Sequence, residues 1–366
     1  MSGYLASFVS GRDNNFNLIR FVAATLVLFS HSFALSIGSS DAEPLRASIG
    51  MTWGDIAVDI FFITSGFLIA NSFLTRSNVL VFLWSRALRI FPALIIAVLF
   101  CVFVIGIAFT SLEPKEYLAH DQTQRYLIKN IMLVGGIEYS LPGVFSENPF
   151  SHAVNGSLWT MPYEVKMYML LIVMFGSFAL ASRATKLLNY KHLIAFLGIS
   201  AITLHIINHF EDLFTGQFLR LFSMFFIGAA FYGWREKIFL SSRITALLLV
   251  LLVAASLVNK TIFFVIYCFA LPLIIFGLAY LVSGQIRRFN KLGDYSYGIY
   301  IYAFPVQQSL AALIPNISVF SMIVLSFLVT CTLAALSWHL IEKRCLKLKS
   351  ANIIPKILLK PTLEKS

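Results

Sequence analysis

Charged residues are scarce in this chain of 366 amino acids, where Asp, Glu, Lys and Arg together make up 12%. Soluble globular domains carry about 25% charged residues, so the scarcity argues against that class. Disorder is excluded as well, because disordered chains combine low hydrophobicity with high charge, whereas 58% of these residues are hydrophobic. The apolar residues form long runs and not the short alternating segments of a membrane β-barrel. The sequence therefore predicts an all-α bundle that crosses a membrane many times.

Cysteine is scarce too, and its spacing excludes two kinds of site. The four cysteines form no Cys-x-x-Cys pair; they are Cys101, Cys268, Cys331 and Cys345. We therefore expect neither a disulfide framework nor a zinc site, and no other metal site is predicted.

Apolar runs bounded by polar clusters predict ten transmembrane helices, each close to the roughly 20 residues that a bilayer requires. They cover residues 16–37, 53–73, 80–109, 162–182, 192–209, 217–233, 243–258, 261–283, 295–314 and 318–341. A loop over about 110–161, rich in Pro, Gly, Asn and Ser, separates the third span from the fourth. A short helix is predicted within it near 123–134.

The basic residues predict the orientation. Of the 28 Lys and Arg residues, 20 fall in the termini and loops on one side, which the positive-inside rule makes cytoplasmic. Both termini are then cytoplasmic and the long loop lies outside. The same bias explains the net charge of +11 without a nucleic-acid partner. We expect residues 1–15 to form a cytoplasmic segment, 16–347 one membrane domain, and 348–366 a basic cytoplasmic tail.

The first span carries two ionisable residues, Arg20 and His31. Such residues are costly inside a membrane, so each is a candidate site residue. Eleven positions correspond to about three turns, which places both side chains on one face about 16 Å apart along the helix. Arg20 then lies near the cytoplasmic boundary and His31 in the outer half. Snorkelling of Arg20 to lipid headgroups and a purely structural His31 are the alternatives, but the shared face favours function.

Three carboxylates are predicted near the outer boundary. Asp55 and Asp59 lie four residues apart on one face of the second span, with Asp59 at a depth similar to that of His31. An Asp beside a His would fix its tautomer and raise its basicity, although a structural hydrogen bond between helices is an equal alternative. Glu164 opens the fourth span, where its charge suits a helix N-terminus.

Two further arginines, Arg86 and Arg89, begin the third span at the level of Arg20. Two arginines by themselves would be explained by the positive-inside rule, which places basic residues at the cytoplasmic boundary. Three arginines at one level suggest a polyanion site, because arginine binds phosphate with two parallel hydrogen bonds. A phosphate-bearing donor could bind there from the cytoplasm and extend a slim arm toward His31, a geometry that suits an acyl-CoA thioester.

Six segments in order resemble acyltransferase family 3, the integral-membrane O-acyltransferases. They are NLIRFVAATLVLFSH, VDIFFITSGFLIA, RALRIFPAL, NGSLWTMPYEVKMY, SYGIYIYAFPVQQ and WHLIEKRCLKL, within about residues 14–347. The resemblance implies transfer of an acyl group, usually acetyl from acetyl-CoA, to a hydroxyl of a surface polysaccharide, an O-antigen or another exported glycan.

The resemblance also assigns roles by position. Arg20 and His31 correspond to the essential pair. The other matching positions are Arg86 and Arg89 for donor binding, Asp59, Ser65 and Gly66 in the second-helix motif, and Glu164 as the fourth-helix acid. The chain departs from the family where many relatives have a histidine just before Pro305, since Ala303 and Phe304 stand there.

The expected reaction uses His31 as the general base on the acceptor hydroxyl, with Asp59 orienting it and Glu164 binding acceptor hydroxyls or gating the outer mouth. A relay through acetylated His31 is the alternative within the same chemistry. Acetyl-CoA is the expected acyl donor, with no permanently bound cofactor. The expected partners are a glycan or lipid-linked glycan acceptor and the lipid bilayer, at the inner (plasma) membrane.

Three other classes of protein compete with this interpretation. A secondary transporter of a small anionic or sugar-like solute also has about ten spans with buried charge, but it often shows repeats, and none is evident here. A non-catalytic scaffold would not need Arg20 and His31 on one face. A membrane acyltransferase of another family would not be expected to show the same segments.

Overall fold

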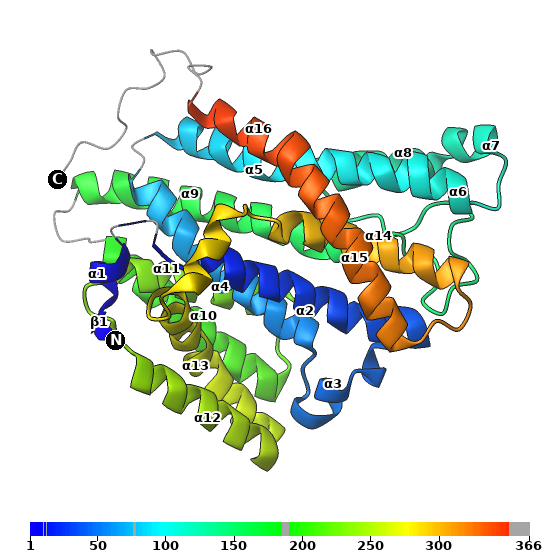
Figure 1. The fold of residues 1–366 in the computed structure, drawn as a ribbon. Coiled ribbons are helices and arrows are strands. Elements are labelled where there is room, and N and C mark those ends of the chain that lie inside the picture. Colours follow the sequence, from blue (N-terminus) through cyan, green and yellow to red (C-terminus); the bar gives the residue numbers. More distant parts are fainter. Residues whose placement is uncertain (10, 12, 76–77, 185–189, 351–366) are drawn as a thin grey trace.

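The computed structural model describes residues 1–9, 11, 13–75, 78–184 and 190–350, which fold mainly into helices (Figure 1). Each of the ten expected ranges contains one long helix. These are α2 (Phe16–Ile37), α4 (Trp53–Thr75), α5 (Val79–Phe100), α9 (Met161–Ala184), α10 (Tyr190–Glu211), α11 (Phe218–Gly233), α12 (Ser242–Val258), α13 (Lys260–Tyr280), α14 (Ser296–Leu313) and α15 (Val319–Ser337). Six helical segments among the described residues are long and apolar enough to cross a membrane. The chain is an all-α, multi-pass membrane bundle.

Shorter elements connect and extend these helices. They are α1 (Leu5–Val9), α3 (Pro44–Ile49), α6 (Ile107–Phe109), α7 (Pro114–Ala119), α8 (Asp121–Met132) and α16 (Lys343–Lys347), the 3-10 helices η1 (Ser40–Ala42), η3 (Gly156–Thr160), η4 (Gln285–Lys291) and η6 (Leu348–Ser350), and the π-helices η2 (Cys101–Gly106) and η5 (Trp338–Glu342). Helix α7 projects at one end of the bundle, and the amino terminus lies at the opposite end (Figure 1). Most of the predicted tail, residues 351–366, lies outside the described residues, as do Arg12, Arg76 and Lys186.

The structure adds one small sheet to the expected all-α fold. Strands β1 (Ser2–Tyr4) and β2 (Phe239–Ser241) pair antiparallel, with Gly3 opposite Leu240. Three-residue strands are too short to carry a recognisable alternating pattern, so the sequence could not predict them. The sheet ties the amino terminus to the segment that precedes α12.

Helix α4 packs against α2, α11 and α13, and its contact with α11 is very close. A Cβ atom on Gly66 of α4 would lie 1.9 Å from the carbonyl oxygen of Phe225, and one on Gly228 of α11 would lie 2.1 Å from that of Ile63. Small residues allow membrane helices to bring their backbones together in this way. The packing explains why the second-helix motif has glycine at position 66.

Gly66→Ala is therefore expected to destabilise the bundle, because the added methyl group meets backbone and not a mobile side chain. Overpacking of this kind costs about 1–3 kcal/mol. The matched control is Gly176→Ala on α9, where a Cβ would meet nothing within 4 Å. Thermal unfolding of the two variants in detergent measures the difference. A Gly66→Ala protein as stable as the control would contradict this packing role.

The end of the long loop folds back into the bundle, where it packs against α14. We call residues 150–160 the re-entrant segment. At its start, the Gln308 side-chain amide of α14 donates to two of its carbonyls, at 2.7 and 2.6 Å. Asn155 then donates to an α14 carbonyl at 2.9 Å, and Thr160 hydrogen-bonds Tyr300 at 2.7 Å. These contacts run along α14 from Gln308 back to Tyr300, a distance of eight residues or about 12 Å. Irregular backbone and the short 3-10 helix η3 are tolerated inside the bundle because protein surrounds them.

Candidate active site

A small cavity lies inside the bundle between α2, α4, α14 and the start of α9. Its volume is about 40 Å³. Because a single water needs about 10–15 Å³ on the same measure, the cavity has room for a few waters or a group as small as acetyl. Apolar side chains make up part of its wall, and its polar members are Arg20, Ser65, Thr160, Glu164, Tyr297 and Tyr300. A concave apolar wall with a few placed polar groups is typical of small-molecule sites.

Arg20 extends from the beginning of α2 into this cavity. Its Nη1 donates to the hydroxyl of Ser65 at 3.3 Å. The guanidinium carbon lies 5.0 Å from the centroid of the Phe61 ring, a cation–π distance that stabilises a cation away from bulk water. Two residues of α4, Ser65 and Phe61, therefore hold the guanidinium of Arg20 at the wall of the cavity.

Glu164 lies with Arg20 and not with His31. It occupies the first turn of α9, lines the cavity and accepts a hydrogen bond from the hydroxyl of Tyr168, four residues further along the helix. The expectation had placed Glu164 in the outer half, beside His31. The difference arises because the re-entrant segment carries the beginning of α9 into the bundle before the helix starts.

Arg89 forms the centre of a buried ion cluster beside the cavity. Its guanidinium pairs with Asp294, which precedes α14, and with Glu342 at 3.4 Å. Glu342 sits on the π-helix η5, a local distortion that often occurs at functional positions. Burial raises the pKa of the Asp294 carboxyl, but Arg89, then Arg20, and hydrogen bonds from Ser296 hold that pKa below its usual value overall.

Arg86 lies one turn before Arg89 on α5 and has different surroundings. Its guanidinium carbon lies 5.9 Å from the centroid of the Phe82 ring, and its Nε donates to Ser85 at 3.4 Å. The charge of Arg89 is balanced by two buried carboxylates. Arg20 reaches the cavity itself.

His31 lies further along α2 and packs against α14. Its ring meets the ring of Phe304 edge to face, with centroids 5.1 Å apart. Its Nδ1 is buried and makes no hydrogen bond within the described residues. Phe304 is the residue just before Pro305, so the position at which the sequence departs from the family lies directly against His31. An imidazole with an unpaired nitrogen can accept a proton from a substrate.

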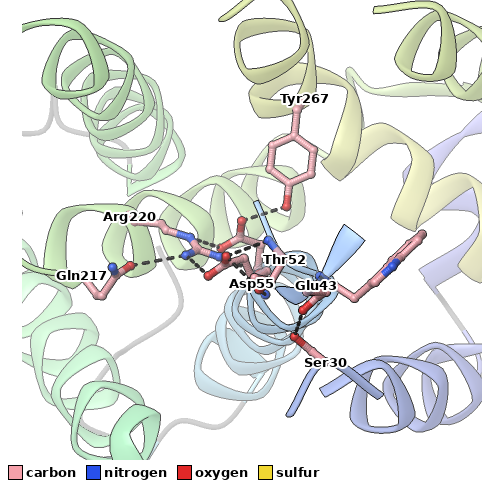
Figure 2. A network of polar contacts seen from close by, with 9 residues as sticks. Ser30, Glu43, Thr52, Asp55, Gln217, Arg220 and Tyr267 are labelled. Carbon is pink, nitrogen blue, oxygen red and sulfur yellow. Dashed lines mark hydrogen bonds and ion pairs between the residues drawn. The ribbon is translucent and has the colours of Figure 1, made fainter. Parts of the chain in front are cut away.

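The carboxylate of Asp59 forms hydrogen bonds with Arg220 and Tyr267 and not with His31. Its Oδ1 accepts from Arg220 Nε at 2.9 Å and its Oδ2 from the Tyr267 hydroxyl at 2.8 Å. Arg220 Nη1 also pairs with Asp55 at 2.8 Å, and Figure 2 shows Arg220 of α11 reaching that carboxylate. The side chain of Asp59 points toward α11 and α13. The expected Asp59–His31 pair is therefore not formed in this structure.

A further buried carboxylate, Glu43, closes the connection between α2 and α4. It is 1% exposed and accepts from the Ser30 hydroxyl and from the backbone N–H of Trp53, the latter at 2.5 Å. Figure 2 shows Glu43 and Ser30 beside Thr52 and Asp55. The carboxylate thus fixes the loop that covers this end of α2.

Sequence reasoning missed Arg220, Tyr267 and Glu43 as members of buried polar networks. A signal for Arg220 existed, because a lone cation within one span and two carboxylates on one face of another are costly unless they pair. No comparable signal marked Glu43, which lies in a polar loop, or Tyr267, which lies in an apolar run.

Comparisons with known proteins agree with this architecture. A family model described as "Acyltransferase domain" matches residues 13–340. An O-acetyl transferase of Shigella phage Sf6 is 31% identical over 93% of this chain and 98% of its own length. Nodulation protein 10 of Rhizobium leguminosarum bv. viciae is 28% identical over 94% of this chain and 96% of its own length. No solved structure matches the chain significantly.

The helical bundle defines a multi-pass membrane protein, and its small cavity has a largely apolar wall with a few polar groups. The chain belongs to acyltransferase family 3, because the family match covers nearly the whole bundle. It is an acyltransferase of the O-acetyltransferase type.

Proposed function

We propose that the protein moves an acetyl group from acetyl-CoA to a hydroxyl of a surface or exported glycan. The observation that carries the proposal is the placement of Arg20 and His31 on one helix, with Arg20 in a cavity of acetyl size and His31 beyond it. The name of the phage relative supports acetyl as the group transferred to oxygen.

The proposed setting is the inner membrane, crossed ten times, with both termini in the cytoplasm. Residues 16–347 then form the catalytic membrane domain between a short segment, 1–15, and a basic tail, 348–366. In this orientation the Arg20 end of α2 faces the cytoplasm, where acetyl-CoA is found, and the His31 end faces the exported glycan.

The proposed donor site uses the arginines unequally. Arg20 and Arg86 contact the phosphates or the thioester end of acetyl-CoA, because arginine recognises phosphate through paired hydrogen bonds. Arg89 acts as a positioning residue, since its charge is already balanced by Asp294 and Glu342. Glu164 belongs to this donor side, where it faces the cavity beside Arg20.

The proposed chemistry is direct transfer. His31 takes the proton of the acceptor hydroxyl, and the hydroxyl oxygen forms a bond with the acetyl carbonyl carbon. The carbon–sulfur bond breaks, and the CoA thiolate leaves and takes up a proton. Catalysis by a positioned base contributes about 10²–10⁴ in rate. Asp59 supports this arrangement indirectly, by holding α4 to α11 and α13.

Transfer of radiolabel from acetyl-CoA into membrane fractions tests the proposal. Label should accumulate in a glycan or lipid-linked glycan fraction and be released by mild base, as expected for an O-acetyl ester. Label confined to protein or to simple lipid would contradict the glycan acceptor. Absence of label from every fraction would contradict acetyl transfer to a membrane acceptor.

Arg86→Gln and Arg89→Gln are expected to differ in kind. Arg86→Gln should raise the KM for acetyl-CoA about 10- to 100-fold, because one charge-assisted contact is worth roughly 1.5–3 kcal/mol. Arg89→Gln leaves Asp294 and Glu342 without their cation, so the amount of folded protein should fall. Donor titrations and quantified membrane levels separate the two effects. A raised KM with normal levels in Arg89→Gln would contradict this division.

A further inference from the structure

Two layers of contacts separate the cavity from His31, and the first is a pair of hydroxyls. Thr160 Oγ1 and the Tyr300 hydroxyl lie 2.7 Å apart, and each residue is 6% exposed. The Tyr300 ring meets the Phe61 ring edge to face, with centroids 5.6 Å apart. The Phe61 ring also makes the cation–π contact with Arg20. Thr160 and Tyr300 line the same cavity as Arg20, so the hydroxyl pair is part of its wall.

The second layer lies one turn further along α14. Phe304 is four residues beyond Tyr300 and therefore on the same face of the helix. Its ring contacts His31 on one side, and on the other side it lies so close to Gly156 that a Cβ there would be 2.5 Å from the ring. In both layers the re-entrant segment meets α14.

These contacts lie along α14 between the residues that line the cavity and the residue that touches His31. An acetyl group that moves along α14 from Arg20 to His31 would have to pass them. We propose that Thr160 and Tyr300 are positioning residues that form a gate between the donor cavity and His31. This inference rests on the proposed function, because it assumes that a thioester must pass from Arg20 to His31.

The gate would protect the thioester from water. In the side reaction, the oxygen of water bonds to the acetyl carbonyl carbon, the carbon–sulfur bond breaks, and acetate and the CoA thiol are released. Closed active sites prevent such hydrolysis of reactive groups. A hydroxyl pair suits this task because its single hydrogen bond is modest, and the Tyr300 hydroxyl can exchange Thr160 for the carbonyl oxygen of an arriving thioester.

Tyr300→Phe and Thr160→Val test the gate, since each removes one hydroxyl and keeps the shape of the side chain. The measured quantity is the rate of acetyl-CoA hydrolysis without acceptor, divided by the rate of acetyl transfer. This ratio should rise about three- to tenfold in each variant, the effect of one net hydrogen bond. The double variant should not exceed the larger single effect, because both changes break the same contact.

Tyr302→Phe is the matched control. Tyr302 lies on the same helix and is 4% exposed, but its ring packs 6.0 Å from that of Phe100 and it does not line the cavity. Its hydrolysis-to-transfer ratio should equal that of the wild type.

An unchanged ratio in a folded Tyr300→Phe or Thr160→Val protein would overturn the gate. Equal loss of hydrolysis and transfer in folded Thr160→Val would also overturn it, because the pair would then serve the chemistry itself. Thr160→Val decides the matter if Tyr300→Phe does not accumulate. A wild-type protein that transfers no acetyl group would instead refute the proposed function, so the two failures can be told apart.

Discussion

Replacing His31 with alanine is expected to lower the rate of acetyl transfer about 10²–10⁴-fold, the contribution of a positioned general base. The amount of folded protein should fall far less than the rate, because the change removes the ring contact with Phe304 but breaks no hydrogen bond of the buried Nδ1 within the described residues. Initial rates at saturating acetyl-CoA, corrected for protein amount, measure the effect.

His205→Ala is the control for this experiment. His205 also lies in an apolar helix, α10, where its ring packs against Phe264 with centroids 5.2 Å apart. It does not line the cavity, so its transfer rate should remain within a few-fold of the wild type. A His31→Ala protein with the rate of this control would show that the proton acceptor is another group.

The second large effect is expected on stability. Arg220→Met leaves the carboxylates of Asp55 and Asp59 without their cation in a site where Asp59 is fully buried. Removal of one partner of a buried pair typically costs about 3–5 kcal/mol. The variant should accumulate poorly, and its unfolding temperature in detergent should fall well below that of the wild type.

Adding Asp59→Asn to Arg220→Met should restore part of the stability, because the second change removes the uncompensated buried charge. Arg235→Met is the matched single control, since Arg235 stacks on the Tyr232 ring at 4.4 Å and donates to that residue's carbonyl. If Arg220→Met unfolds at the temperature of the control, the network in Figure 2 contributes little to stability.

Hydropathy predicted the helices well, because a membrane span must satisfy its own backbone and therefore needs one long apolar run. The ten expected ranges each hold a long helix. Hydropathy could not predict the re-entrant segment. Its Asn, Gly and Ser residues look like an external loop, and their burial depends on contacts with α14 that lie about 140–160 residues away in sequence.

The candidate site was predictable in part. Helix geometry places Arg20 and His31 on one face, and the structure holds Arg20 in a cavity and His31 beyond it. The partner of Asp59 was not predictable, because the rotation of α4 about its axis decides whether that side chain meets α2 or α11. Only the packed bundle fixes that rotation, here with Gly66 held against α11.

The central claim is that one passage through the bundle connects a cytoplasmic donor site at Arg20 with a base at His31. Sealed membrane vesicles test it most directly, with radiolabelled acetyl-CoA supplied only to the outer solution. We expect label in the glycan fraction of inverted vesicles, whose cytoplasmic face is outside, and its loss in both Arg20→Ala and His31→Ala. Equal labelling of right-side-out vesicles, or undiminished labelling by either variant, would contradict the account.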